Sequence, residues 1–153
     1  MKITNIKQQV KRADRYSVFV DGKYSFSLSE AALLSERLAG GQEIDKVRLD
    51  ELKKTSGADK AYGNALRYVA MRPRSVWEVQ TYLRRNQVDE PVAEDIIGRL
   101  ESVGLLDDVA FAQAWVANRR LLKSVSKRKL KLELQQKRLP ESVISQAMQE
   151  DEA

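Results

Sequence analysis

The sequence predicts a mainly α-helical protein: tandem three-helix modules, two repeats in an elongated array, preceded by a small N-terminal domain of a β-hairpin plus a helix. Three observations predict this fold class. Apolar and polar residues alternate in 16–20 and 24–28, on either side of an Asp-Gly pair. From residue 45 onward, apolar residues recur at helical spacing. The segments that begin at Ser75 and Ser126 then repeat one apolar pattern at an offset of 51 residues.

The N-terminal strands are predicted from this alternation. Asp21-Gly22 is the favoured pair for a two-residue type I′ turn, because both central positions need a positive φ. Each arm has one apolar face, formed by Tyr16, Val18 and Val20 in the first arm and by Tyr24, Phe26 and Leu28 in the second. Residues 3–10 are expected to add a third strand. Ser29 is expected to cap a helix that ends at Gly40-Gly41 and helps to cover the ribbon.

Short helices are expected over the rest of the chain. A break at Ser56-Gly57 separates the first two, and Pro73 ends the second, because the residue before a proline is disfavoured in the α region. Ser75 and Glu78 form a capping box that opens the next helix. Later helices are expected to begin near residues 89, 107, 126 and 140. The predicted domains are therefore 1–56 for the hairpin and helix, 57–105 for the first module and 106–153 for the second.

The composition excludes several classes of function. There is no cysteine and no histidine, so disulfides and thiolate metal sites are impossible and the commonest general base is missing. No run approaches the roughly 18 apolar residues of a membrane span, and the basic N-terminus lacks the apolar core of a secretion signal. We expect a cytoplasmic, monomeric protein with no catalytic residue, no metal and no cofactor.

The positive charge is concentrated in one segment. The net charge is +5, and residues 119–138 alone hold nine Lys or Arg and one Glu, a local +8. A solvated helix face is the alternative, but this asymmetry favours a polyanion or an acidic protein surface as partner. The same helix is flanked by basic residues in both modules, which predicts a basic stripe for binding. Its members are Arg72, Arg74, Arg84, Arg85, Arg119, Arg120, Lys123, Lys127, Arg128, Lys129 and Lys131.

The stretch GLLDDVAFAQAWVANRR, residues 104–120, allows two interpretations. Its aspartates, Asp107 and Asp108, could hold a metal, but no further acidic residue lies at useful spacing, so helix capping is favoured. Its aromatics, Phe111 and Trp115, could stack on bases, but their helical spacing favours a place in the core. Trp77 fits the inward stripe of its own helix poorly, as does Tyr82, and one of the two is expected on the surface.

Two segments together resemble the RecX family of bacterial regulators of the RecA recombinase. In that family, an R-P-R-S-x-x-E-L pattern opens the second helix of the first module. Here this pattern is Arg72-Pro73-Arg74-Ser75 with Glu78, and Val79 replaces the Leu. The pattern G-L-L-D-D-x-x-F-A-x-x-W-V-x-x-R joins the modules and matches residues 104–119 throughout. The N-terminal hairpin also resembles an extension that some members carry.

The resemblance implies tandem three-helix modules and a non-enzymatic role. RecX-like proteins bind the RecA filament on single-stranded DNA and block or reverse its growth, which damps recombination and strand exchange. Members commonly carry three or more modules, whereas this chain has two, so it is either a short member or a shortened chain. Two alternatives remain open: a general DNA-binding helical protein without a recombinase partner, and an enzyme that would have to work with carboxylates, Lys, Ser or Tyr alone.

Overall fold

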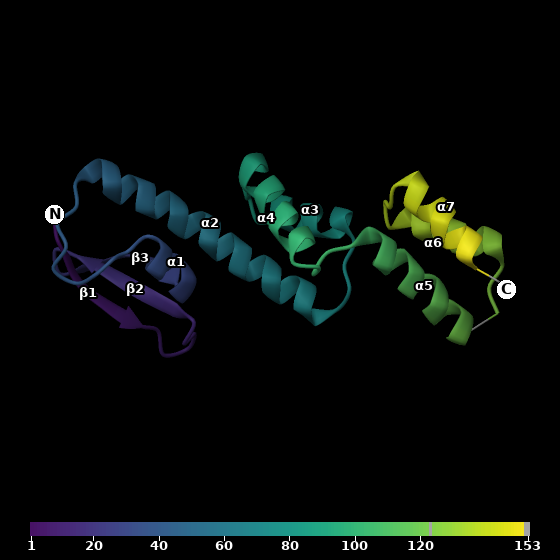
Figure 1. The fold of residues 1–153 in the computed structure, drawn as a ribbon, viewed down its shortest axis with the longest axis horizontal. Helices are drawn as coiled ribbons and strands as arrows, with labels where there is room; N and C mark the ends of the chain where they lie inside the picture. Colours follow the sequence, from purple (N-terminus) through teal and green to yellow (C-terminus); the bar gives the residue numbers. More distant parts are fainter. Residues whose placement is uncertain (123, 152–153) are drawn as a thin grey trace. The chain divides into compact units, whose positions relative to one another are not determined.

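The computed structural model describes residues 1–122 and 124–151, and Lys123 lies outside this range. Within it, a three-stranded antiparallel sheet precedes seven helices (Figure 1). This confirms the mainly helical class with a small N-terminal β element. The chain forms two compact units, Met1–Gly63 and Asn64–Ala153. The predicted domain limits themselves stay a prediction.

The sheet of the first unit has the order β1 (Ile3–Gln8), β2 (Arg15–Val20), β3 (Lys23–Ser29). This confirms both the hairpin and the third strand. At the turn, Asp21 has a φ of 49° and Gly22 a φ of 80°, as a type I′ turn requires.

The predicted apolar face of β3 is wrong at Tyr24. Val18 pairs with Phe26, but its neighbour Phe19 pairs with Tyr24, so Ser25 is an extra residue in the ladder. Such a bulge interrupts the alternation of side chains between the two faces. Tyr24 is therefore 58% exposed, with its ring edge-on to Phe19 at 6.1 Å between centroids.

One helix of the first unit is shorter than predicted. Ser29 does cap α1 (Glu30–Ser35), accepting a hydrogen bond from the amide of Ala32 at 3.2 Å. The helix ends five residues before Gly40, and Arg37 adopts a φ of 54°. Apolar side chains after this end still pack against the buried face of the sheet. The core comprises Ile3, Val18, Val20, Phe26, Leu28, Ile44 and Leu52.

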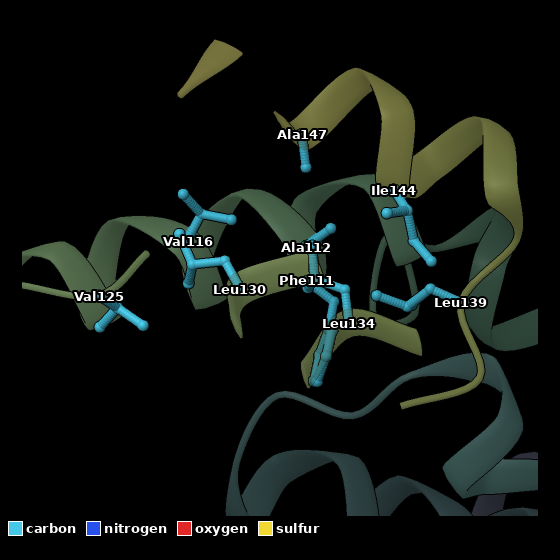
Figure 2. Packing of buried hydrophobic residues seen from close by; sticks show 9 residues of the cluster. All are labelled: Phe111, Ala112, Val116, Val125, Leu130, Leu134, Leu139, Ile144 and Ala147. Atoms are coloured by element: carbon cyan, nitrogen blue, oxygen red, sulfur yellow. The ribbon is translucent and has the colours of Figure 1, made fainter. Parts of the chain in front are cut away.

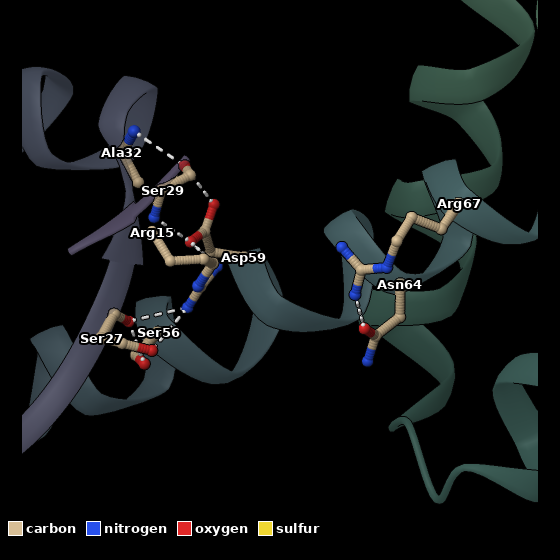
Figure 3. Close-up of polar contacts among 8 residues, drawn as sticks. All are labelled: Arg15, Ser27, Ser29, Ala32, Ser56, Asp59, Asn64 and Arg67. Carbon is tan, nitrogen blue, oxygen red and sulfur yellow. Dashed lines mark hydrogen bonds and ion pairs between the residues drawn. The ribbon is translucent and has the colours of Figure 1, made fainter. Parts of the chain in front are cut away.

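The predicted helix break at Ser56-Gly57 is also wrong, because α2 (Lys46–Met71) is continuous. A glycine inside a helix costs only about 1 kcal/mol, which tertiary contacts can offset. Two residues later, Asp59 accepts hydrogen bonds from Arg15 at 2.8 Å and from the amide and hydroxyl of Ser29 at 2.7 Å each (Figure 3). This network ties the middle of α2 to the sheet.

The second unit contains two modules with one backbone plan. Module one consists of the end of α2 from Asn64, α3 (Val76–Arg85) and α4 (Glu90–Ser102). Module two consists of α5 (Asp108–Leu122), α6 (Lys127–Gln136) and α7 (Glu141–Glu150). Equivalent helices are offset by 51 residues. This offset separates the end of α2 from the end of α5, the start of α3 from the start of α6, and the start of α4 from the start of α7. Even the left-handed residue after α3, Gln87 with φ 60°, recurs after α6 as Arg138 with φ 57°.

The predicted serine caps are confirmed in both modules. Ser75 forms the complete capping box with Glu78, and Ser126 accepts a hydrogen bond from the amide of Lys129 at 3.1 Å. In module two, side chains from all three helices meet in one core, which includes Phe111 (Figure 2). Its buried members are Phe111, Ala112, Val116, Val125, Leu130, Leu134, Leu139, Ile144 and Ala147.

Candidate functional site

The two aspartates of the 104–120 stretch, Asp107 and Asp108, cap two different helices. Asp107 accepts hydrogen bonds from the amides of Val109 at 3.0 Å and Ala110 at 3.1 Å, which confirms the predicted cap of α5. Asp108 instead accepts from the amide of Val76 at 2.9 Å, in the first turn of α3. Burial raises the pKa of Asp108, this hydrogen bond opposes the rise, and the charge of Asp107 adds to it. Asp108 therefore fastens module two to module one, a role that the sequence did not reveal.

Metal binding finds no support at this joint. Among residues 1–122 and 124–151, no three carboxylates come together as a hard cation would need. In the same residues, no helix combines the length and the apolar character of a membrane-spanning segment.

The two motif segments that carry the family resemblance meet at a groove of about 420 Å³ in the second unit. Arg72 and Arg74 line it from the loop after α2, and Leu105, Asp107 and Phe111 line it from the module joint. The structure thus brings together segments about 30 residues apart in the chain.

The arginines of the first motif bind within the protein. Arg74 is largely covered: its guanidinium lies 3.8 Å from the ring centroid of Tyr68, and its Nε donates to the Tyr68 carbonyl at 3.2 Å. Its Nη1 also forms an ion pair with Glu78 Oε2 at 3.8 Å. Arg72 is half exposed and donates to Glu78 Oε2 at 2.7 Å. Glu78 is also the acceptor of the capping box, so both arginines support the start of α3.

The arginines at the end of α5 are also engaged. Arg119 donates to both carboxylate oxygens of Glu133, at 3.0 and 2.9 Å, and Trp115 Nε1 donates to the same group at 3.1 Å. Burial alone would raise the pKa of Glu133, but these hydrogen bonds and the charges of Arg119 and Lys129 outweigh it, so the pKa lies below its ordinary value. Arg120 pairs with Asp151 at 2.7 Å and donates to the Val125 carbonyl.

Five cations of the predicted stripe are exposed and have no side-chain hydrogen bond or ion pair in the described part of the chain. We call them the free cations: Arg84, Arg85, Lys127, Arg128 and Lys131. Lys129 is exposed too, but its charge acts on Glu133. The predicted continuity of the stripe across both modules stays a prediction.

The free cations occupy different parts of equivalent helices. In α6, Lys127, Arg128 and Lys131 lie in the first turn and a half, and their i, i+1, i+4 spacing places them on one side. In α3, Arg84 and Arg85 lie in the last turn. Cations at a helix C-terminus are favoured by the macrodipole, whereas those at the start of α6 are disfavoured. The start of α6 therefore keeps its charge at some cost in stability.

Comparison with known proteins gives one consistent family. The model of the regulatory protein RecX N-terminal domain matches residues 1–45. The models of the first and second three-helix domains of RecX match residues 61–100 and 107–148.

The curated relatives are longer than this chain. "Regulatory protein RecX" of Halalkalibacterium halodurans is 36% identical over 150 residues, which cover 95% of this chain and 56% of the relative. The protein of the same name from Listeria innocua is 31% identical, with 98% and 56% covered. The chain thus spans just over half the length of these relatives.

Two solved structures share the fold. One, described as the crystal structure of regulatory protein RecX, superposes with a TM-score of 0.83 at 30% identity and covers 97% of this chain and 72% of its own. The crystal structure of RecX from Lactobacillus salivarius has a TM-score of 0.58 at 25% identity, with 60% and 59% covered.

Proposed function

Because this chain belongs to the RecX family of regulatory proteins, we propose that it binds RecA-type recombinase filaments on single-stranded DNA and inhibits or disassembles them. In this proposal the chain is a cytoplasmic, monomeric binding protein that catalyses no reaction and needs no cofactor. It thereby modulates recombination and DNA repair.

The observation that carries the proposal is the set of free cations. A phosphate backbone is recognised chiefly by unpaired Lys and Arg, because each contact releases a condensed counterion. Arg74, Arg119 and Arg120 are engaged by internal partners, so they contribute less to such a surface. We therefore assign the contacts with DNA or recombinase first to the free cations, with Lys129 and the half-exposed Arg72 as secondary members.

The first experiment titrates the full chain into RecA assembled on single-stranded DNA and follows ATP turnover. The expected result is suppression at amounts below one chain per recombinase subunit, because a filament stops growing when its end is blocked. Unchanged turnover at equimolar chain would refute the proposed function.

A charge reversal tests the site. The triple variant K127E/R128E/K131E should bind DNA more weakly, and each lost phosphate contact should lower the salt slope of the affinity by about 1. The matched control reverses three exposed lysines of α2, in K53E/K54E/K60E, with the same change in net charge. Equal losses in both variants would show a general charge effect without a defined site.

The same pair of variants separates the two candidate roles. A general DNA-binding protein would lose any effect on RecA together with its DNA affinity. If K127E/R128E/K131E loses DNA binding but still suppresses ATP turnover, the free cations of α6 serve DNA and a different surface contacts the recombinase.

A further inference from the structure

One aromatic side chain of the second unit stands apart from the others. Trp77, the second residue of α3, is 39% exposed. Tyr68 and Tyr82 stack on each other at 4.1 Å, and Trp115 is held by its hydrogen bond to Glu133. Within the described residues, the Trp77 ring has no stacking partner, no cation above it and no acceptor for its indole N–H.

Trp77 shares its helix face with polar and basic side chains. Gln80 and Arg84 follow at i+3 and i+7, and both are exposed. Arg85 is adjacent to Arg84, and both are free cations. The face therefore offers a flat aromatic ring, an amide that can donate and accept hydrogen bonds, and two positive charges. Two glutamates of the neighbouring α4, Glu90 and Glu94, line a small pocket together with Gln80 and Arg84, so Arg85 is the cation of this face that is farther from acidic side chains.

A second irregularity lies beside Trp77. The hydroxyl of Thr81, four residues along the helix, is the one buried side-chain polar atom without a hydrogen-bond partner among the described residues. Such atoms are rare in native proteins and need an explanation. An exposed aromatic ring and an unsatisfied hydroxyl thus occur at i and i+4 on the same helix.

We propose that this face of α3 binds single-stranded nucleic acid, with an unpaired base stacked on Trp77 and the flanking phosphates held by Arg84 and Arg85. Every base has a π-face, so stacking on an indole is tolerant of sequence. In a duplex these faces are covered by neighbouring base pairs, so the site selects unpaired strands. A protein partner would fit this face less well, because the exposed helix positions i+3 and i+7 from Trp77 hold the polar Gln80 and Arg84.

Module two lacks this feature. The residue equivalent to Trp77 is Arg128, and the residue equivalent to Gln80 is Lys131. The same face of α6 can therefore hold phosphates but cannot stack a base. In the cell, the strand bound at Trp77 would be the DNA of the recombinase filament, so this part of the inference rests on the proposed function. The binding of a single strand to α3 itself requires no recombinase.

The experiment measures binding of the full chain to three labelled 15-mers by fluorescence anisotropy: oligo-dT, an abasic deoxyribose-phosphate strand and a duplex. W77A should weaken binding to oligo-dT by about 5- to 150-fold, the range for loss of one stacked base, and change binding to the abasic strand less than 2-fold, about the error of such a measurement. W77F should retain most of the affinity. Oligo-rU in place of oligo-dT tells a DNA-selective site from one that takes either strand.

The matched control is Y24A, which removes an exposed aromatic of the first unit and should leave oligo-dT binding unchanged. A second readout is tryptophan fluorescence: oligo-dT should quench the wild type, and W77F should lose this quenching. Wild-type affinity of W77A for oligo-dT, or equal losses on oligo-dT and the abasic strand, would overturn the inference.

The recombinase assay separates this inference from the proposed function. If wild type binds oligo-dT through Trp77 but has no effect on RecA turnover, the proposed function fails and the inference stands. If W77A keeps its oligo-dT affinity but loses suppression of RecA turnover, the face contacts protein and the inference is wrong.

Discussion

The two modules place different chemistry at the same backbone positions. In module one, Tyr68 and Tyr82 stack with parallel rings 4.1 Å apart. Fifty-one residues later, these positions hold Arg119 and Glu133, which form an ion pair at 2.9 Å. Arg120 and Asp151 likewise form an ion pair at positions occupied in module one by Val69 and Leu100.

The modules also differ at the start of their second helix and at the position of Trp115, which donates a hydrogen bond to the ion-paired Glu133. Glu78 completes the capping box of α3, whereas Lys129 stands at the equivalent place in α6. Trp115 donates to Glu133, while its counterpart Asn64 accepts a hydrogen bond from Arg67 (Figure 3). One backbone plan thus accepts aromatic stacking or ion pairing between its first two helices, because the helix positions stay fixed by the apolar core beneath them.

The largest expected effect comes from breaking the ion pair of module two. R119A should destabilise module two by about 2–3 kcal/mol, because it leaves the half-buried Glu133 carboxylate without its cation. The double variant R119Y/E133Y should recover most of this loss, since the same positions hold a tyrosine pair in module one. Amide hydrogen exchange of α5 and α6 measures the change locally.

Exchange in α3 and α4 serves as the internal control for both variants. If R119Y/E133Y is no more stable than R119A, the modules do not share interchangeable packing at these positions, and the comparison fails.

A pH difference between the modules is expected next. The pKa of Glu133 is lowered by folding, so the stability it contributes is present above the ordinary pKa of about 4.5 and is lost as the pH falls through the lowered value. At pH 7, E133Q should be less stable than wild type by about 1–2 kcal/mol. Urea unfolding monitored on module two should show this gap closing below pH 4.5. A gap that stays constant down to pH 2 would contradict the assignment.

A smaller effect is expected at the joint. D108A should lose about 1 kcal/mol, the usual value of a helix cap. D108N keeps an oxygen that can accept from the Val76 amide, so it should stay within about 0.5 kcal/mol of wild type at pH 7. Because burial raises the pKa of Asp108 above 3.8, the folded chain holds its proton to higher pH, and wild type should lose stability relative to D108N as the pH rises through that window.

Thermal unfolding of the two Asp108 variants between pH 3 and 7 checks both points. Equal losses in D108A and D108N would mean that the negative charge, and not the acceptor oxygen, holds α3.

The smallest expected effect restores the missing capping box. K129Q places an acceptor at the N3 position of α6 and removes a cation from the positive end of the helix dipole. It also removes the charge that helps to lower the pKa of Glu133, so the net stabilisation of module two should be only about 0.5 kcal/mol. Lys129 is only a secondary member of the proposed surface, so affinity for DNA should fall less than in K127E/R128E/K131E. Hydrogen exchange of α6, compared with that of α3, measures the gain, and a loss of protection would contradict it.

Much of the fold could be predicted because its signals are local. Asp21-Gly22, Ser75 and Ser126 act on their own backbone neighbours, and the repeat at 51 residues is visible as an apolar pattern. The helix break predicted at Ser56-Gly57 is wrong because contacts from distant residues, which the local sequence does not show, act on this segment. Local propensity disfavours a helix there, and the hydrogen bonds of Asp59 to Arg15 and Ser29, from 44 and 30 residues away, tie the helix to the sheet.

The sequence predicts where the candidate site lies, but it does not predict which of its residues are free to bind a partner. Charge counting located the segment, yet it could not tell an arginine that faces solvent from one that has an internal partner. Arg74 lies on Tyr68, and Arg119 and Arg120 are paired with acids 14 and 31 residues further on. The sequence predicts that one of Trp77 and Tyr82 lies on the surface, and only the stacking of Tyr82 on Tyr68 decides which.

The sequence by itself determined the order of the elements, the caps, the repeat, the excess of charge and the resemblance to RecX, because each depends on residues close in the chain or on composition. The tertiary structure alone decided which cations stay free, which aromatic stays exposed and which aspartate joins the modules. Those outcomes depend on partners far apart in sequence, such as Asp108 with Val76 and Arg120 with Asp151, which only folding brings within hydrogen-bond distance.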